Sequence, residues 1–243
     1  MMSVRANRAR TWAIVGGAVL LIGFVAVIVS AITGRISSPD PTSSSTTAHP
    51  STPTASATDV PGEVVDPGAT KRGLVAEPIT TDADTYIRAA LAAASTFDST
   101  LSTRDEWLSY LDTWLTPDTR YDESERAADL QAVKVELRQA VVIPQDQWDS
   151  LAQENGRVAA KASGDIARQS VPADQTGDMT IGTADVVLTT TSSDGSSGEL
   201  SYDEKIRVSV QVLCGEGSIP TPNSAQRAGD CKIVRYFTEP LEP

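Results

Sequence analysis

The stretch Tyr202–Gly215 reads YDEKIRVSVQVLCG, and it decides how the second half of the chain folds. Apolar residues occupy every second position of its central part, and polar residues stand between them. The apolar positions are Ile206, Val208, Val210 and Val212, and the polar positions are Arg207, Ser209 and Gln211. Because successive side chains of a strand point to opposite faces of a sheet, this alternation predicts a strand with one buried face and one face in water.

Alternation of this kind begins after Gly156 and continues to the end of the chain. The residues 191–199, TSSDGSSGE, are typical of a turn between two strands. Further strands are expected at residues 157–164, 167–171, 179–191 and 231–240.

Before Gly156 the apolar residues recur at the spacing of a helix. Helices are expected at residues 82–98 with Thr81 as cap, 102–118, 122–142, and from Pro144 onward. Thr103 and Glu106 have the spacing of a capping box at the start of the second helix. Helices followed by antiparallel strands predict an α+β domain in which a curved sheet wraps the helices.

Large apolar side chains gather on one face of the second helix, and we interpret them as buried core. The same residues are also the candidates to line a pocket, should the domain contain one. The candidate core or pocket residues are Trp107, Trp114, Trp148, Leu111, Tyr86 and Phe97.

The chain has two cysteines, at the end of one expected strand and the start of the next. Cys214 and Cys231 would lie opposite each other in an antiparallel pair, at the ~5.5–6 Å Cα separation that a disulfide requires. A metal site needs more ligands than two sulfurs, and a redox pair more often has the CxxC spacing. We therefore expect a structural disulfide, provided that the domain is exported to an oxidising compartment.

The N-terminus predicts that export. Residues 1–10 form a basic tail, and residues 11–34 contain no charge. As a helix this uncharged segment spans ~36 Å, enough for the hydrocarbon core of a bilayer. The preceding arginines place the N-terminus in the cytoplasm and the rest of the chain outside the cell membrane. A cleaved signal peptide is the alternative interpretation, and it also exports the domain.

Residues 35–80 are rich in Ser, Thr and Pro, and we expect a disordered linker that precedes the exported domain at residues 81–243. The histidine at position 49, the single one in the sequence, falls in this linker. The domain therefore lacks the imidazole that Ser/His/Asp and Cys/His catalysis require, and no phosphate-binding or metal-binding motif is found in the sequence. We expect no enzyme activity, no metal and no cofactor.

The net charge of the chain is −12, from 20 basic and 32 acidic residues. Four of the basic residues and none of the acidic ones lie in the first 35 positions, so the remainder carries −16. A surface this acidic repels phosphate groups, which argues against direct nucleic-acid binding by the exported domain.

The segment 97–124, FDSTLSTRDEWLSYLDTWLTPDTRYDES, resembles membrane proteins carried by actinobacterial integrative and conjugative elements, as does IPQDQWDSLAQENGRVAAKASG at residues 143–164. The domain also looks like the cone-shaped α+β fold of nuclear transport factor 2, which serves in the bridging subunit of type IV secretion and conjugation machines. The resemblance implies a scaffold that contacts other membrane or secretion proteins, and by analogy a homo-oligomer. It transfers no catalytic residue.

Two further functions remain open at this point. The domain could be an extracytoplasmic binding module that holds a small apolar ligand in a cone-shaped pocket lined by Trp107, Trp114 and Trp148. It could also be an enzyme of the cone-fold type, although such enzymes generally place a histidine, aspartate or tyrosine in the pocket.

Overall fold

The computed structural model describes residues 62–196 and 198–242. The expected membrane segment 11–34 and the linker up to residue 61 lie outside these residues, and so does His49. Among the described residues, no helix has both the length and the apolar character needed to cross a bilayer.

Helices form the first half of the domain, as expected. They are η1 (Ala69–Arg72), α1 (Ala83–Ala93), α2 (Arg104–Thr113), α3 (Glu123–Glu136), the π-helical turn η2 (Leu137–Val141) and α4 (Gln145–Gln153). The capping box of α2 is confirmed, because the Thr103 side chain accepts from the Glu106 N–H and the Glu106 side chain accepts from the Thr103 N–H. In α1 the cap is Asp82 and not Thr81.

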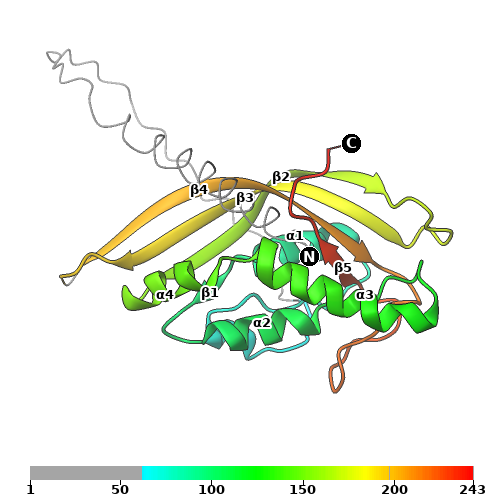
Figure 1. Cartoon of the computed structure of the whole chain (residues 1–243), viewed down its shortest axis with the longest axis horizontal. Helices are drawn as coiled ribbons and strands as arrows, with labels where there is room; N and C mark the ends of the chain where they lie inside the picture. The colour runs from blue at the N-terminus through cyan, green and yellow to red at the C-terminus, as the bar shows by residue number, and fades with distance from the viewer. Residues whose placement is uncertain (1–61, 197, 243) are drawn as a thin grey trace, which may run out of the picture. The chain divides into compact units, whose positions relative to one another are not determined.

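Five antiparallel strands follow one another in the order β1-β2-β3-β4-β5 and form one curved sheet. They are β1 (Phe97–Asp98), β2 (Arg157–Ser170), β3 (Met179–Ser193), β4 (Glu199–Leu213) and β5 (Lys232–Tyr236). Figure 1 shows the long strands arching over the helices, which cover the concave face of the sheet. The expected α+β arrangement, with helices packed on a curved antiparallel sheet, is confirmed.

Several element boundaries differ from the sequence prediction. The helix α2 ends at Thr113 and not at residue 118, and β5 ends at Tyr236 and not at residue 240. The first helix ends at Ala93 and not at residue 98, because Phe97 pairs with Val158 as the short strand β1. Residues 157–170 form one strand and not two. A register shift lies between Ser163 and Ala167, and Gly164 within it adopts a φ of 70°, so the strand bends without ending.

The alternation in β4 correctly predicts which side chains enter the main core, but the other face is not in water throughout. Val210 and Val212 are buried against the helices, and Ser209 and Gln211 are buried on the convex face. The C-terminal segment covers that face, since the Leu241 N–H donates to Ser209 Oγ at 2.8 Å. A second small core forms there from Val171, Met179, Ile181, Leu213 and Val234, with Phe237 and Leu241 packed against it.

Residues 62–80 belong to the folded domain, which corrects the linker prediction for this part of the chain. The Val65 N–H donates to the Glu77 carbonyl at 2.9 Å, and the Ile79 N–H donates to the Glu63 carbonyl at 2.8 Å. Leu74 and Glu77 are buried. The composition of this segment is that of a linker, and it is ordered by partners far away in the sequence.

The disulfide between Cys214 and Cys231 is present, as predicted. Their Cα atoms are 4.0 Å apart, closer than expected. The reason is that the two N–H groups donate elsewhere, to Asp178 and Thr80, so the cysteines lie opposite each other as a non-hydrogen-bonded pair, in which the backbones approach more closely. The disulfide closes the loop 215–230, which lies below β5 in Figure 1.

Replacing both cysteines with serine should lower the free energy of unfolding by about 3 kcal/mol, because the disulfide restricts a loop whose ends are 17 positions apart. Urea unfolding of the purified chain, followed by tryptophan fluorescence, measures this change. An unchanged midpoint and slope would show that the rest of the structure holds the loop without the bond.

Candidate functional site

Three of the candidate pocket residues pack against one another between α2, α4 and β1. The ring centroids of Phe97 and Trp148 are 4.4 Å apart, and those of Trp107 and Trp148 are 5.6 Å apart and nearly parallel. The Trp107 indole N–H donates to the Ala93 carbonyl at 3.1 Å. All three side chains are buried, so this group is core.

The remaining candidates form a second buried group at the other end of α2. Trp114 lies 5.9 Å from the Tyr86 ring and 6.0 Å from the Tyr110 ring, and it is fully buried. Leu111 is buried between the two groups on the same helix face. The structure therefore divides the six residues between two packed clusters.

These rings fill the space in which a small apolar ligand would lie. A depression of about 400 Å³ lies instead on the outer surface, where it is open to solvent. Its walls come from the segment around η1 and from α2, and the residues that line it are Asp66, Arg72, Asp105, Glu106, Ser109 and Tyr110.

A buried ion pair adjoins the second aromatic group. Lys232 Nζ lies 2.9 Å from Glu77 Oε1, and both side chains are almost completely buried, with 1% and 0% of their surface exposed. Burying two charges is costly unless every other hydrogen-bonding atom of the pair is satisfied. The lysine meets this demand by donating also to the Thr113 carbonyl at 2.6 Å and to Thr221 Oγ1 at 2.8 Å.

Glu77 forms hydrogen bonds with three other parts of the chain. The Tyr86 hydroxyl donates to Glu77 Oε1 at 2.6 Å, and the Gln226 amide donates to the same oxygen at 3.2 Å. The Glu77 backbone N–H donates to the Tyr110 hydroxyl at 3.0 Å. We call this set, together with Lys232, the Glu77–Lys232 cluster. It joins the segment 62–80, the helices α1 and α2, the disulfide loop and β5.

Burial dominates the electrostatics of the cluster. It lowers the pKa of the Lys232 ammonium, and the neighbouring Glu77 carboxylate partly opposes that effect. Burial also raises the pKa of the Tyr86 hydroxyl well above its ordinary value, and the charge of Glu77 adds to the increase. The pKa of Tyr110 rises to about 12 for the same main reason, and burial raises the pKa of Tyr236 as well.

Two atoms of this region have no hydrogen-bond partner among the described residues: Glu77 Oε2 and the indole nitrogen of Trp114. A glutamate, a lysine and two tyrosines so close together resemble a site for acid–base chemistry. The lysine and the glutamate are, however, almost completely buried, so their charged atoms contact other groups of the protein and not solvent.

The sequence does not predict this cluster, because Glu77 falls in the expected linker and Lys232 is one residue of an expected strand. One signal was available. Lys232 follows a cysteine and precedes Ile233 and Val234 in a strand that ends with an aromatic residue, so a charge there requires a buried partner.

No family model matches the sequence, and no curated protein matches it. Among solved structures there is a likeness to CagV, a VirB8 homolog of the type IV secretion system from Helicobacter pylori strain 26695. The two chains are 15% identical, and the match covers 52% of this chain and 88% of that chain, with a TM-score of 0.27. A likeness at this level carries no argument about function.

The buried tyrosines predict a loss of stability in alkali. Tyr86, Tyr110 and Tyr236 stay protonated in the folded chain, whereas the unfolded chain loses these protons above pH ~10, so stability falls as the pH rises. Lys232 acts in the opposite direction, because its lowered pKa adds stability with rising pH, but only up to its ordinary pKa of about 10.5. Above that pH the three tyrosines together should remove about 4 kcal/mol per pH unit.

Thermal unfolding of the purified chain at a series of alkaline pH values measures this effect. The Tyr236→Phe variant is the matched control, because it loses one ionisable hydroxyl and should reduce the slope by about a third. A melting temperature that stays constant between pH 10.5 and the value of about 12 given for Tyr110 would contradict the prediction.

Proposed function

We propose that this chain is a non-enzymatic, membrane-anchored assembly component of a conjugative transfer or type IV secretion-like apparatus. Residues 11–34 anchor it in the cell membrane with the N-terminus in the cytoplasm, and the domain described here works on the extracytoplasmic side. Its partners are other membrane or secretion-apparatus proteins.

The observation that carries this proposal is that the interior of the domain is already occupied. The aromatic residues that could have lined a pocket pack on one another, and the charged cluster beside them is closed to solvent. A domain whose interior is full acts through its outer surface, which is the property expected of a scaffold. The alternative function, a module holding a small apolar ligand among the tryptophans, is disfavoured by the same observation.

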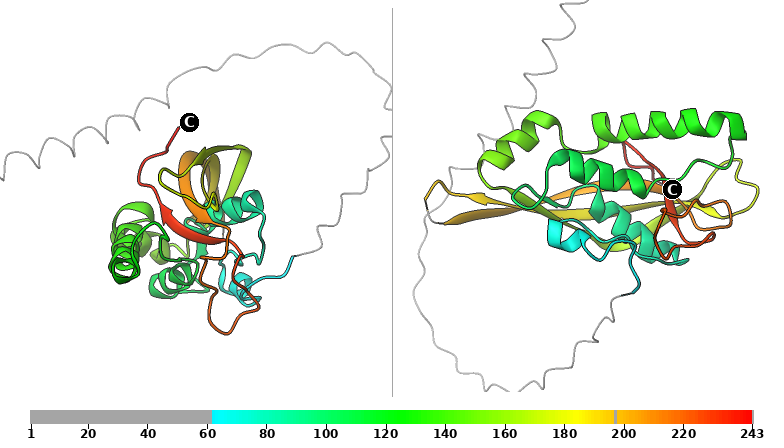
Figure 2. Two further views of the ribbon diagram at one scale, coloured as in Figure 1. Left: turned by 90° about the vertical axis from the view of Figure 1, so that its right-hand side faces the viewer. Right: turned by 90° about the horizontal axis from the view of Figure 1, so that it is seen from below.

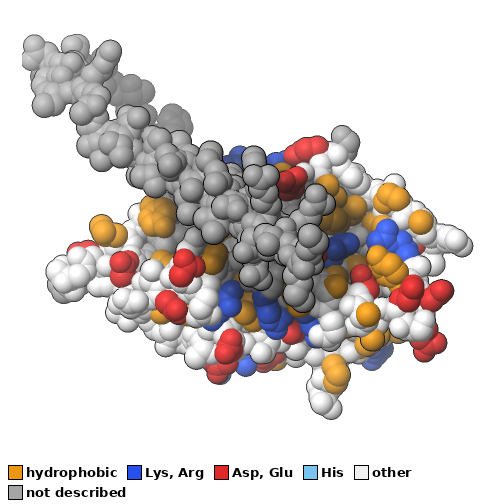
Figure 3. Space-filling view, viewed as in Figure 1, with side chains coloured by type: hydrophobic (Ala, Val, Ile, Leu, Met, Phe, Trp, Pro, Cys, Tyr) orange, Lys and Arg blue, Asp and Glu red, His pale blue; other side chains and the backbone are white. Residues whose placement is uncertain are grey.

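The surface and the internal crosslinks also support a scaffold. Figure 3 shows acidic and basic side chains interspersed over the visible part of one face, with hydrophobic side chains in small separate groups. The disulfide closes the loop 215–230, and the Glu77–Lys232 cluster ties the start of the domain to its last strand. Such a domain keeps its shape in an oxidising compartment, where it would meet its partners. The resemblance of residues 97–124 to proteins of conjugative elements supports an apparatus of this kind.

Deletion of the gene from its native host should abolish or strongly reduce conjugative transfer, and the wild-type gene should restore it. The matched control is a chain in which residues 11–34 are replaced by a cleaved signal peptide, so that the domain is exported but not anchored. This variant should accumulate outside the cell membrane and fail to restore transfer.

A tagged wild-type chain, crosslinked in intact cells, should co-purify with conjugation proteins, and the unanchored variant should not. Normal transfer after deletion would end the proposal. Mass spectrometry of small molecules extracted from the purified chain tests the alternative, which requires a stoichiometric apolar ligand.

A further inference from the structure

One edge of the sheet is open along most of β4. On this edge β4 pairs with β5, but only over Val210–Leu213. Among the described residues, the one further backbone hydrogen bond at this edge runs from the Phe237 N–H to the Ser209 carbonyl. The ladder between β3 and β4 is unbroken from Glu199 to Leu213. The backbone groups of residues 199–208 on the outer side are therefore unpaired within the described part of the chain.

The opposite edge of the sheet is protected in ways that β4 is not. There, β2 is interrupted by the register shift between Ser163 and Ala167, and its start is paired with β1. The Thr96 hydroxyl also accepts from the Ala160 N–H. Bulges and coverings of this kind keep an edge from pairing with another chain, and a long regular edge without them is a template for a further strand.

The open part of β4 also extends beyond the helices. Figure 2 shows the end of the β3–β4 hairpin projecting past α4. Every residue from Glu199 to Lys205 is exposed, and Leu200 and Tyr202 have 62% and 61% of their surface in solvent. A projecting hairpin with large apolar side chains in water is stabilised when another strand pairs with it and removes some of this apolar surface from water.

The hydrogen bond at Ser209 fixes which residues of β4 offer their backbone groups. The Ser209 carbonyl points to the open edge, and in a strand the N–H and C=O groups of every second residue point the same way. Odd-numbered residues therefore present donors and acceptors to an incoming strand. Even-numbered residues would form the non-hydrogen-bonded pairs.

The sequence of this edge is complementary to itself. When a second copy runs antiparallel along it with the two-fold axis at Glu204, acid faces base and apolar faces apolar on both sides of the axis, and Glu204 faces itself at the axis. The facing pairs are Asp203 with Lys205, Tyr202 with Ile206, Leu200 with Val208 and Ser201 with Arg207, each occurring twice. Such cross-strand pairs contribute roughly 0.2–1 kcal/mol each.

Neighbouring registers lose this complementarity. Each of them sets Glu204 against an apolar residue: Tyr202 with the axis at Asp203, Ile206 with the axis at Lys205, and Leu200 with the axis at Tyr202. The axis at Glu204 avoids all three of these mismatches, and its one unfavourable pair is Glu204 with itself.

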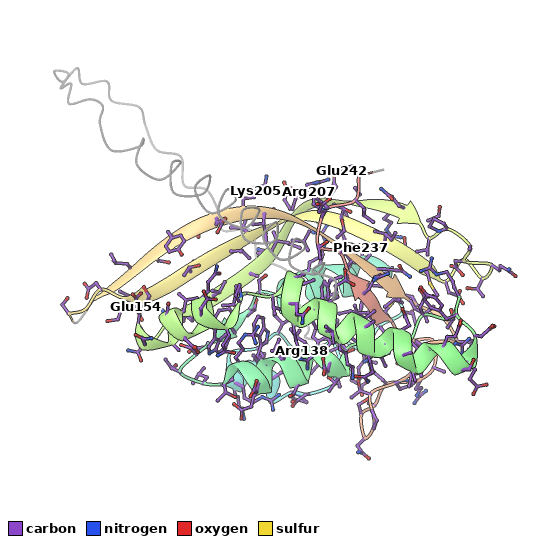
Figure 4. All side chains as sticks on the ribbon, in the orientation of Figure 1. Arg138, Glu154, Lys205, Arg207, Phe237 and Glu242 are labelled. Atoms are coloured by element: carbon purple, nitrogen blue, oxygen red, sulfur yellow. A yellow bond between two sulfur atoms is a disulfide. The ribbon has the colours of Figure 1, made fainter. Side chains whose placement is uncertain are left out.

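We propose that a second copy of this chain binds along Leu200–Val208 of β4, so that two sheets join through an antiparallel pair centred on Glu204. The salt bridges that Lys205 and Arg207 already form within the chain do not prevent this pairing. Lys205 contacts Asp185 on the convex face and is still 62% exposed at its side chain, whereas Arg207 is held by Asp185 and Glu242 (Figure 4). This inference goes beyond the proposed function and does not depend on it.

Cysteine crosslinking of the full-length chain tests the register. At the axis, Glu204 of each copy forms a non-hydrogen-bonded pair with a Cα separation of about 4.5 Å, which suits a disulfide. Under mild oxidation the Glu204→Cys variant should form covalent dimers several-fold faster than Tyr202→Cys or Ile206→Cys. Equal rates for the three variants, or no dimer from Glu204→Cys, would overturn the proposal.

A charge exchange tests the pairing without an added thiol. Lys205→Glu sets a glutamate against Asp203 twice and should weaken dimerisation at least about tenfold in sedimentation equilibrium. The double variant Asp203→Lys/Lys205→Glu recreates the opposite charges and should restore it, and Glu204→Gln should strengthen it. Thermal melting checks that each variant folds. A wild-type chain that stays monomeric throughout, or a double variant as weak as Lys205→Glu, would contradict the pairing.

Discussion

The buried ion pair between Lys232 and Glu77 is the interaction on which the rest of this domain depends. A lysine and a glutamate with almost no exposed surface need hydrogen-bond partners in a protein interior, and Lys232 Nζ and Glu77 Oε1 have them, whereas Glu77 Oε2 has none among the described residues. Those partners come from every layer of the domain. The segment before α1 supplies the glutamate, the helices supply a carbonyl and a tyrosine hydroxyl, and the disulfide loop supplies Thr221 and Gln226.

This requirement explains several features that would otherwise be separate. Residues 62–80 are ordered because Glu77 must reach the lysine, although their composition is that of a linker. The loop after β4 folds back because two of its side chains complete the cluster, and the disulfide at its base limits how far it can open. The tyrosines and Trp114 exclude water from the charges, and the same packing fills the space that a ligand would need. An interior used in this way leaves the outer surface and the open edge of β4 for contacts with other molecules.

The sequence predicts well those features that depend on neighbouring residues. The capping box at Thr103 and Glu106 and the apolar stripe of α2 are local patterns, and the structure contains both. The alternation in β4 and the position of Cys214 next to Cys231 follow from the geometry of two adjacent antiparallel strands. The candidate site was predicted less well. The pairing of Glu77 with Lys232 spans 155 positions, and the C-terminal segment reaches Ser209 from 32 positions away. No local sequence pattern predicts such contacts, because they form only when whole helices and strands pack together.

A double-mutant cycle of Glu77→Gln and Lys232→Met, measured by urea unfolding, tests the central role of the ion pair most directly. Each single variant leaves one buried group without its partner and should lower the free energy of unfolding by about 3–5 kcal/mol. The double variant removes both charges and should lose clearly less than the sum of the two single losses. Single losses below about 1 kcal/mol, or losses that simply add, would show that the domain does not depend on this pair.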